Sequence, residues 1–301
     1  MSAPVTVVWY TDPHNVWCWG FEPAIRRLEV RYPHDVSIEV RQGGLFEDFS
    51  PVREQWARMS GGRWKDSVRM FFDAVASQHR MPMASEPMTE GADDFSSTWP
   101  ACIAAKAAGL QGPDAGWRYL RSLREAWCLD GRPIHRRDVQ EALAAEARLE
   151  VDAFRAALDD GSAEAAFRWD RDACRDHQVT GFPTFEVRAG DEAVSETVRL
   201  EGWQPWETFD ELLHKLDPGL TPVALPSPEA AVRDLFRGHD RLATREIAAV
   251  LGGTDDDAEI VLEGLEERGD IVRRAVGKGL IWEAPGRVPA DPAAERVRGP
   301  Q

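Results

Sequence analysis

Cysteine thiols are the side chains of this sequence best suited to covalent chemistry, because a thiolate attacks disulfides and binds metals. The chain of 301 residues has four of them, at Cys18, Cys102, Cys128 and Cys174. Their wide separation matches no disulfide framework, so we expect reduced thiols in a cytoplasmic protein. Cys18 draws most interest, because it closes the run Asn15-Val16-Trp17-Cys18, which follows a predicted strand and enters a predicted helix.

Metal and nucleotide sites have little support in the sequence. Cys174 and His177 have the spacing of zinc ligands, but they fall on one predicted helix with no second pair nearby. The sequence has neither a P-loop nor a dinucleotide-binding glycine pattern. We therefore expect no metal and no nucleotide cofactor.

The net charge of the chain limits the kinds of partner that it can bind. The formal net charge is -16, which repels nucleic acid and anionic membrane surfaces. The N-terminus lacks the basic and apolar regions of a signal peptide, and no apolar run approaches the length of a membrane span. We expect a cytoplasmic protein that binds neither nucleic acid nor membranes.

The elements that position Cys18 follow from the hydrophobic periodicity. Residues 5–10 predict a buried strand, residues 17–30 a helix, and residues 37–41 a second strand parallel to the first. Residues from about 51 to 178 have helical patterns almost throughout. Two strands, at 184–187 and 197–200, and a helix at 206–216 follow. This order predicts an α/β protein with a thioredoxin fold, at residues 1–217, that carries a large all-helical insertion.

A second, smaller domain is predicted beyond a proline-rich linker at residues 218–228. Residues 229–285 predict three helices and a hairpin, which resembles a winged helix. The third helix begins Asp255-Asp256-Asp257, and these carboxylates would face DNA phosphates, so contact with protein is favoured over contact with DNA. Residues 286–301 are rich in Pro, Ala and Arg and are predicted to be disordered.

Three sequence runs resemble the cytoplasmic DsbA-like oxidoreductases, a group that includes FrnE-like proteins and SpxH-type protease adaptors. The first, at residues 12–23, resembles the active-site pattern Asp-Pro-x-Cys-x-Trp-Cys-Trp-Gly-Phe-Glu-Pro, and the second, at residues 179–185, resembles the cis-proline loop. The third and weakest lies in the insertion, as Ser97-Thr98-Trp99-Pro100, Ala105-Lys106-Ala107-Ala108 and Leu123-Arg124-Glu125-Ala126. The resemblance covers roughly residues 5–216.

One position departs from this pattern. Asn15 occupies the place of the attacking cysteine, and Cys18 matches the second, resolving cysteine. Thiol–disulfide exchange begins with thiolate attack, and an amide supplies no such nucleophile. The resemblance therefore implies a degenerate Cys-x-x-Cys site that cannot complete a dithiol–disulfide cycle.

The roles of Asn15 and Cys18 stay open at this point. Asn15 either caps the following helix or, like the serine of the related kappa-class glutathione transferases and 2-hydroxychromene-2-carboxylate isomerases, holds a glutathione sulfur. Cys18 is either an inert buried residue or a single redox-active thiol.

Four further residues are candidates for substrate or peptide binding: His14, Trp17, Phe182 and Pro183. The resemblance implies a cis bond before Pro183, with the backbone of Phe182 turned toward the active-site loop to pair with a peptide or glutathione. Phe182 is expected to make that groove more apolar, and Trp17 to line it. Trp17, Trp19 and Phe21 are expected to form an aromatic cluster. His14 either assists proton transfer and thiolate stabilisation or is solvated.

Three functions are compatible with these residues. The first is a DsbA-family oxidoreductase-like protein with a degenerate site. The second is a non-catalytic adaptor that binds a protein or peptide client. The third is a glutathione-dependent transferase or isomerase, with glutathione as its ligand.

Overall fold

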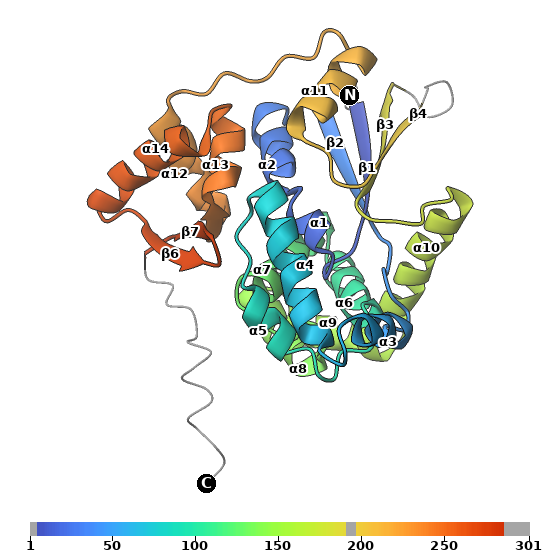
Figure 1. The fold of residues 1–301 in the computed structure, drawn as a ribbon. Coiled ribbons are helices and arrows are strands. Elements are labelled where there is room, and N and C mark those ends of the chain that lie inside the picture. The colour runs from blue at the N-terminus through green and yellow to red at the C-terminus, as the bar shows by residue number, and fades with distance from the viewer. Residues whose placement is uncertain (1–4, 191–196, 286–301) are drawn as a thin grey trace.

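A computed structural model describes residues 5–190 and 197–285. Its main sheet, within these residues, has four strands in the order β2-β1-β3-β4 (Figure 1). β1 is parallel to β2 and antiparallel to β3, which is antiparallel to β4. The strands are β1 (Val5–Thr11), β2 (Val36–Gln42), β3 (Thr184–Ala189) and β4 (Thr197–Glu201). This is the predicted thioredoxin fold.

The connection from β1 to β2 differs from the prediction of one continuous helix. It consists of a single helical turn, α1 (Val16–Trp19), and a separate helix, α2 (Glu22–Arg31). Pro23 lies in the first turn of α2. Because proline has no N–H to donate to a preceding turn, it is tolerated at a helix start and interrupts a helix interior. The break therefore follows from Pro23.

The core of the thioredoxin fold lies between the sheet and the two helices α2 and α11 (Trp206–Leu216). Val7 and Trp9 from β1 are fully buried, as are Ile25 from α2 and Phe209 from α11. Burial of such side chains contributes about 1.5–3 kcal/mol each, so this core holds α1 firmly at the end of the sheet.

The insertion between β2 and β3 is helical, as predicted, and has a hydrophobic core of its own. Its helices are α3 (Ser50–Met59), α4 (Trp64–His79), α5 (Ser85–Glu90), α6 (Trp99–Gly109), α7 (Pro113–Cys128), α8 (Arg137–Glu146), α9 (Val151–Asp159) and α10 (Ser162–Asp176). α4 packs over α1 so closely that a Cβ on Gly20 would lie 2.3 Å from the His79 ring. The insertion therefore forms one wall beside the candidate site.

The C-terminal segment, residues 228–285, has its own core and a three-stranded sheet of order β5-β7-β6. Its elements are α12 (Pro228–Gly238), β5 (Arg241–Ala243), α13 (Thr244–Leu251), α14 (Asp255–Glu267), β6 (Val272–Val276) and β7 (Gly279–Glu283). β5 was not predicted, because three residues are too few to show a period. Assignment of this C-terminal domain as a winged helix stays a prediction, and the predicted tail at 286–301 lies outside the described residues.

Thr244 lies inside the first turn of α13, whose N-cap is Ala243. Its hydroxyl accepts a hydrogen bond from the buried Trp282 indole N–H at 2.9 Å. A buried indole needs an acceptor, and here the hydroxyl serves a side chain of β7 instead of the helix start.

The C-terminal domain is docked on the rest of the chain, with α13 beside α2 (Figure 1). Ala243, Val276 and Ile281 join the hydrophobic core of the insertion. Val30 of α2 packs in turn against the core of the C-terminal domain. No described helix has the length and apolar composition needed to cross a membrane.

Candidate functional site

The loop between β1 and α1 is organised by the buried carboxylate of Asp12. This carboxylate accepts hydrogen bonds from the backbone N–H of His14 at 2.8 Å and of Leu45 at 2.7 Å, and it contacts the Cys102 thiol at 3.4 Å. The bonds tie the loop to the segment after β2 and to α6. Asn15 is thereby held in a fixed position at the start of α1.

Asn15 is 6% exposed, and both ends of its amide are bonded. The Oδ1 atom accepts from the backbone N–H of Trp17 at 2.9 Å, which makes Asn15 the N-cap of α1. The Nδ2 atom donates to the backbone carbonyl of Phe182 at 2.9 Å. The side chain therefore links the start of α1 to the loop before β3.

Cys18 is fully buried, one turn along from Asn15. Burial raises the pKa of its thiol to about 11, although Arg124 and a hydrogen bond from Thr11 act in the opposite direction. All four cysteines are buried and unpaired. A thiol with this pKa is almost entirely protonated at neutral pH, so Cys18 has the environment of an inert core residue.

The peptide bond between Phe182 and Pro183 is cis, and both residues are buried. The ring of Phe182 lies on Gly43, where a Cβ would fall 1.9 Å from a ring carbon. The expectation that this ring makes a groove more apolar is wrong, because the ring points into the core. Phe182 meets the active-site loop through its carbonyl, which Asn15 already binds.

The expected cluster of Trp17, Trp19 and Phe21 does not form. Trp17 is half-buried, with its ring 6.2 Å from His79 and 6.4 Å from Trp203. Trp19 is buried, and its indole N–H donates to the Pro82 carbonyl at 2.9 Å. Phe21 packs in the sheet core, 4.2 Å from the ring of Phe185. Trp17 and Trp19 are two positions apart in α1 and point in different directions, and Phe21 lies beyond the end of α1, at the N-cap of α2.

His14 is 7% exposed and packs against the rings of Phe95 and Trp127, 5.0 Å and 5.2 Å away. Neither of its ring nitrogens has a hydrogen-bond partner among the described residues. Burial, reinforced by the neighbouring His135, lowers the pKa of His14 to about 3. The ring is therefore neither solvated nor a cation that could stabilise a thiolate at neutral pH.

Two charged residues beneath the loop were missed by the sequence reasoning. Glu22 of α2 forms an ion pair with Arg124 of α7, and Arg124 also donates to the hydroxyl of Thr11 and lies 4.3 Å above the Trp9 ring. The signal was present, because Glu22 and Arg124 each belong to a run that carries the family resemblance. The structure shows that these runs meet.

The arrangement has limited chemical capacity. Position 15 has no nucleophile, Cys18 is buried and protonated, and His14 is neutral. Within residues 5–190 and 197–285, no three histidine, cysteine or acidic side chains converge as metal ligands. What the site retains is a rigid junction of the loop, α1 and the segment before β3.

Residues 9–211 match the family model described as thioredoxin. A ClpXP adapter protein SpxH from Shouchella clausii is 31% identical over 282 residues, which cover 94% of this chain and 89% of the relative. The chain belongs to the SpxH-like branch of the DsbA-like thioredoxin family. A second ClpXP adapter protein SpxH, from Halalkalibacterium halodurans, is 27% identical over 279 residues, which cover 93% of this chain and 88% of that relative.

Solved structures support the fold of this SpxH-like chain. A probable DsbA oxidoreductase from Streptomyces coelicolor has a TM-score of 0.55 and 19% identity, over 73% of this chain and 93% of its own. The cytosolic disulfide reductase DsbM from Pseudomonas aeruginosa has a TM-score of 0.52 and 22% identity. The match covers 70% of this chain and 99% of DsbM. These neighbours match about the share of the chain that the thioredoxin fold and its insertion occupy, whereas the SpxH relatives match nearly all of it.

Proposed function

We propose that this protein is a non-catalytic adaptor that binds a client protein and delivers it to a ClpXP-type protease. The observation that carries the proposal is the bonding of Asn15. Its amide stands at the place of the attacking thiol and is used as a helix cap and as a tie to Phe182. A site built in this way serves structure and binding rather than disulfide exchange.

The extent of the family match supports the adaptor over the oxidoreductase. The relatives named ClpXP adapter proteins align with up to 94% of the chain, a share that requires the C-terminal domain. The reductase DsbM aligns with 70%. An adaptor must contact both a client and a protease, and a second docked domain supplies additional surface for that purpose.

A glutathione-dependent transferase is less favoured as the function. The Oδ1 atom of Asn15 already accepts a hydrogen bond from the Trp17 N–H. Its Nδ2 atom already donates to the Phe182 carbonyl, which is the backbone group that an extended ligand would bind. We therefore predict no heat of binding when reduced glutathione is titrated into the protein. Saturable heat would revive this alternative.

Insulin-disulfide reduction tests whether the site is redox-inactive. We expect the wild-type protein to be inactive, because exchange needs an accessible thiolate. Asn15→Cys restores the missing thiol of the motif and should gain turnover. The matched control is Asn15→Cys combined with Cys18→Ala, which has the attacking thiol without the resolving one and should not turn over. Insulin reduction by the wild type at the rate of an active Asn15→Cys variant would refute the proposal.

Protein half-lives in the host test the adaptor role. Loss of this protein should lengthen the lifetime of its clients, and restoring either the wild type or Cys18→Ala should shorten it again, because delivery does not use the thiol. If a folded Cys18→Ala variant failed to restore turnover, a redox function would be required instead.

A further inference from the structure

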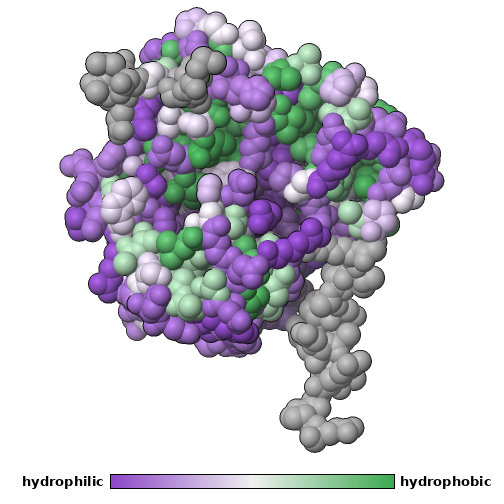
Figure 2. All heavy atoms as spheres, turned by 180° about the vertical axis from the view of Figure 1, so that it is seen from behind, coloured by the Kyte–Doolittle hydropathy of each residue, from purple (hydrophilic) through white to green (hydrophobic). Residues whose placement is uncertain are grey.

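A groove of about 590 Å³ lies between the C-terminal domain and helices α7 and α8. In Figure 2, hydrophilic side chains surround the hollow between the C-terminal domain and the rest of the molecule. The lining holds eight arginines against five carboxylates, in a chain whose net charge is -16. The groove is therefore a local concentration of positive charge on an acidic protein, and none of the candidate site residues of the thioredoxin fold lines it.

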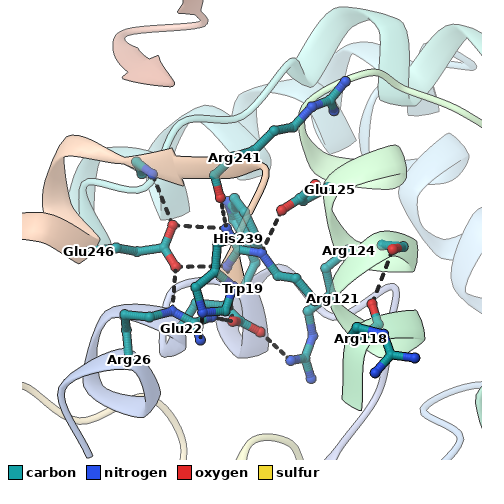
Figure 3. Close-up of polar contacts among 12 residues, drawn as sticks. Trp19, Glu22, Arg26, Arg118, Arg121, Arg124, Glu125, His239, Arg241 and Glu246 are labelled. Carbon is teal, nitrogen blue, oxygen red and sulfur yellow. Dashed lines mark hydrogen bonds and ion pairs between the residues drawn. The ribbon is translucent and has the colours of Figure 1, made fainter. Parts of the chain in front are cut away.

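The floor of this groove is neutralised internally. Arg121 of α7 donates to both carboxylate oxygens of Glu246 on α13, at 2.8 Å and 2.9 Å, and to Glu22 of α2 at 2.9 Å (Figure 3). Arg26 donates to Glu22 and, at 2.9 Å, to the ring of His239. The opposite charges of these side chains pair with one another, and Arg26 Nε lies 3.5 Å from Glu246 as an ion pair without a hydrogen bond, so the floor contributes to the shape of the groove more than to its charge.

The rim of the groove is different. Arg118, near the middle of α7, and Arg148, just after α8, are exposed and have no carboxylate partner among the described residues. In Figure 3 the Arg118 side chain extends away from the buried network. Arg132 and Arg237 have one carboxylate partner each, the exposed Glu146 and Asp234. Guanidinium groups with free N–H donors therefore stand around the opening.

We propose that this groove binds an acidic segment of a client protein. The inference rests on the adaptor function proposed above and specifies its client-binding surface. Guanidinium groups bind carboxylates through paired hydrogen bonds, and the four rim arginines come from four separate segments, as a chain with several carboxylates requires. A single phosphate would need donors that converge on one point.

The charge of the whole molecule adds selectivity. An acidic segment is repelled by most of this surface and attracted only at the groove, so the long-range field directs it to one place. Rim charges act mainly on the rate and specificity of association, and their effect falls as salt screens it. Binding is therefore expected to weaken as the ionic strength rises.

Fluorescence anisotropy with a labelled peptide of alternating Glu and Leu tests the inference on the full-length protein. The double variant Arg118→Glu, Arg148→Glu should weaken binding by at least about tenfold, because two attractive rim charges become repulsive. The matched control Arg58→Glu, Arg63→Glu makes the same change of charge at exposed positions near the α3–α4 turn and should change affinity by less than about twofold. A peptide with Lys in place of Glu should not bind.

Three results would overturn the inference: no saturable binding to the wild type at low salt, equal affinity of the groove variant and the control, or displacement of the peptide by inorganic phosphate at equal concentration. All four substituted arginines are exposed, and circular dichroism verifies that both variants fold. Anisotropy reports on Arg118 and Arg148, whereas insulin reduction reports on Asn15, so the two proposals fail separately.

Discussion

At the scale of single residues, the amide of Asn15 has properties that an attacking thiolate at the same place lacks. It is neutral, so it can be buried without the cost of burying a charge. It both donates and accepts, which allows it to satisfy the Trp17 N–H and the Phe182 carbonyl together. The consequence is a junction whose polar groups are occupied before any ligand arrives.

Substitution of Asn15 should therefore lower stability. Asn15→Ala loses the cap and leaves the Phe182 carbonyl without this donor, and we expect the free energy of unfolding to fall by about 1–3 kcal/mol. Asn15→Asp keeps the cap acceptor but places a carboxylate against that carbonyl, so its loss should be larger. Chemical denaturation measures both changes.

Gln111→Ala is the control for this prediction. The Gln111 amide also donates one hydrogen bond and accepts one, with Glu150, but at the surface, where water replaces the lost partners. Its effect should stay within about 0.5 kcal/mol. Equal stability of Asn15→Ala and the wild type would show that the buried junction contributes nothing.

At the scale of elements, a buried network of charges joins α2, α7 and α13. Glu246 is fully buried and accepts from two nitrogens of Arg121 and from the backbone N–H of Ala243. Burial works to raise the pKa of Glu22, but Arg124, Arg121 and Arg26 outweigh it and lower this pKa to about 2. Such pairs specify one docking geometry, because any other arrangement leaves a buried charge without a partner.

Glu246→Ala should destabilise the docked C-terminal domain. It leaves the buried Arg121 without its bidentate partner but still paired with Glu22 and Glu125, so the cost should lie below the roughly 3–5 kcal/mol of a buried charge left without any partner. We expect a matching fall in the free energy of unfolding and faster proteolysis in the linker before α12. The control Glu263→Ala removes only an exposed contact of 3.7 Å with Arg273, worth at most about 1 kcal/mol. Equal effects of the two variants would contradict the prediction.

At the scale of the whole molecule, buried neutral histidines make the fold sensitive to acid. His14 and His79 are 7% and 2% exposed. Burial lowers the pKa of His79 to about 4, and burial with His135 lowers that of His14 to about 3. In the unfolded chain both titrate near pH 6.5 and bind protons that the folded protein excludes.

The free energy of unfolding should therefore fall as the pH falls below about 6.5, by up to about 1.4 kcal/mol per pH unit for each histidine. The loss from His79 ends near pH 4, its folded pKa, and that from His14 near pH 3. His14→Gln and His79→Gln should each make the pH dependence between about 6.5 and 4.5 shallower, whatever they do to stability at pH 8.

His34→Gln is the matched control, because His34 is exposed. It should leave the slope of stability against pH unchanged. Denaturant titrations at several pH values measure the slopes. If the His14 and His79 variants kept the wild-type slope, these rings would not be the source of acid sensitivity.

The sequence by itself determined the local elements and the family. Alternating and helical patterns located the strands of the sheet, the helical insertion and α11, because these depend on neighbouring residues. The motif runs around Asn15 and Pro183 identified the branch of the thioredoxin family, since both mark turns of fixed geometry. Pro23 also carried the signal for the helix break, which periodicity alone concealed.

Only the tertiary structure decided which side chains meet. Arg121 and Glu246 are 125 positions apart, and nothing in either local pattern pairs them. Three other features likewise depend on how the insertion and the β3 segment pack against the loop. They are the burial of His14, the inward orientation of the Phe182 ring, and the hydrogen bond from the Asn15 amide to the Phe182 carbonyl. Periodicity reports which face of an element is apolar, whereas the partner of a buried polar group is set by docking of distant segments, which a local pattern does not encode.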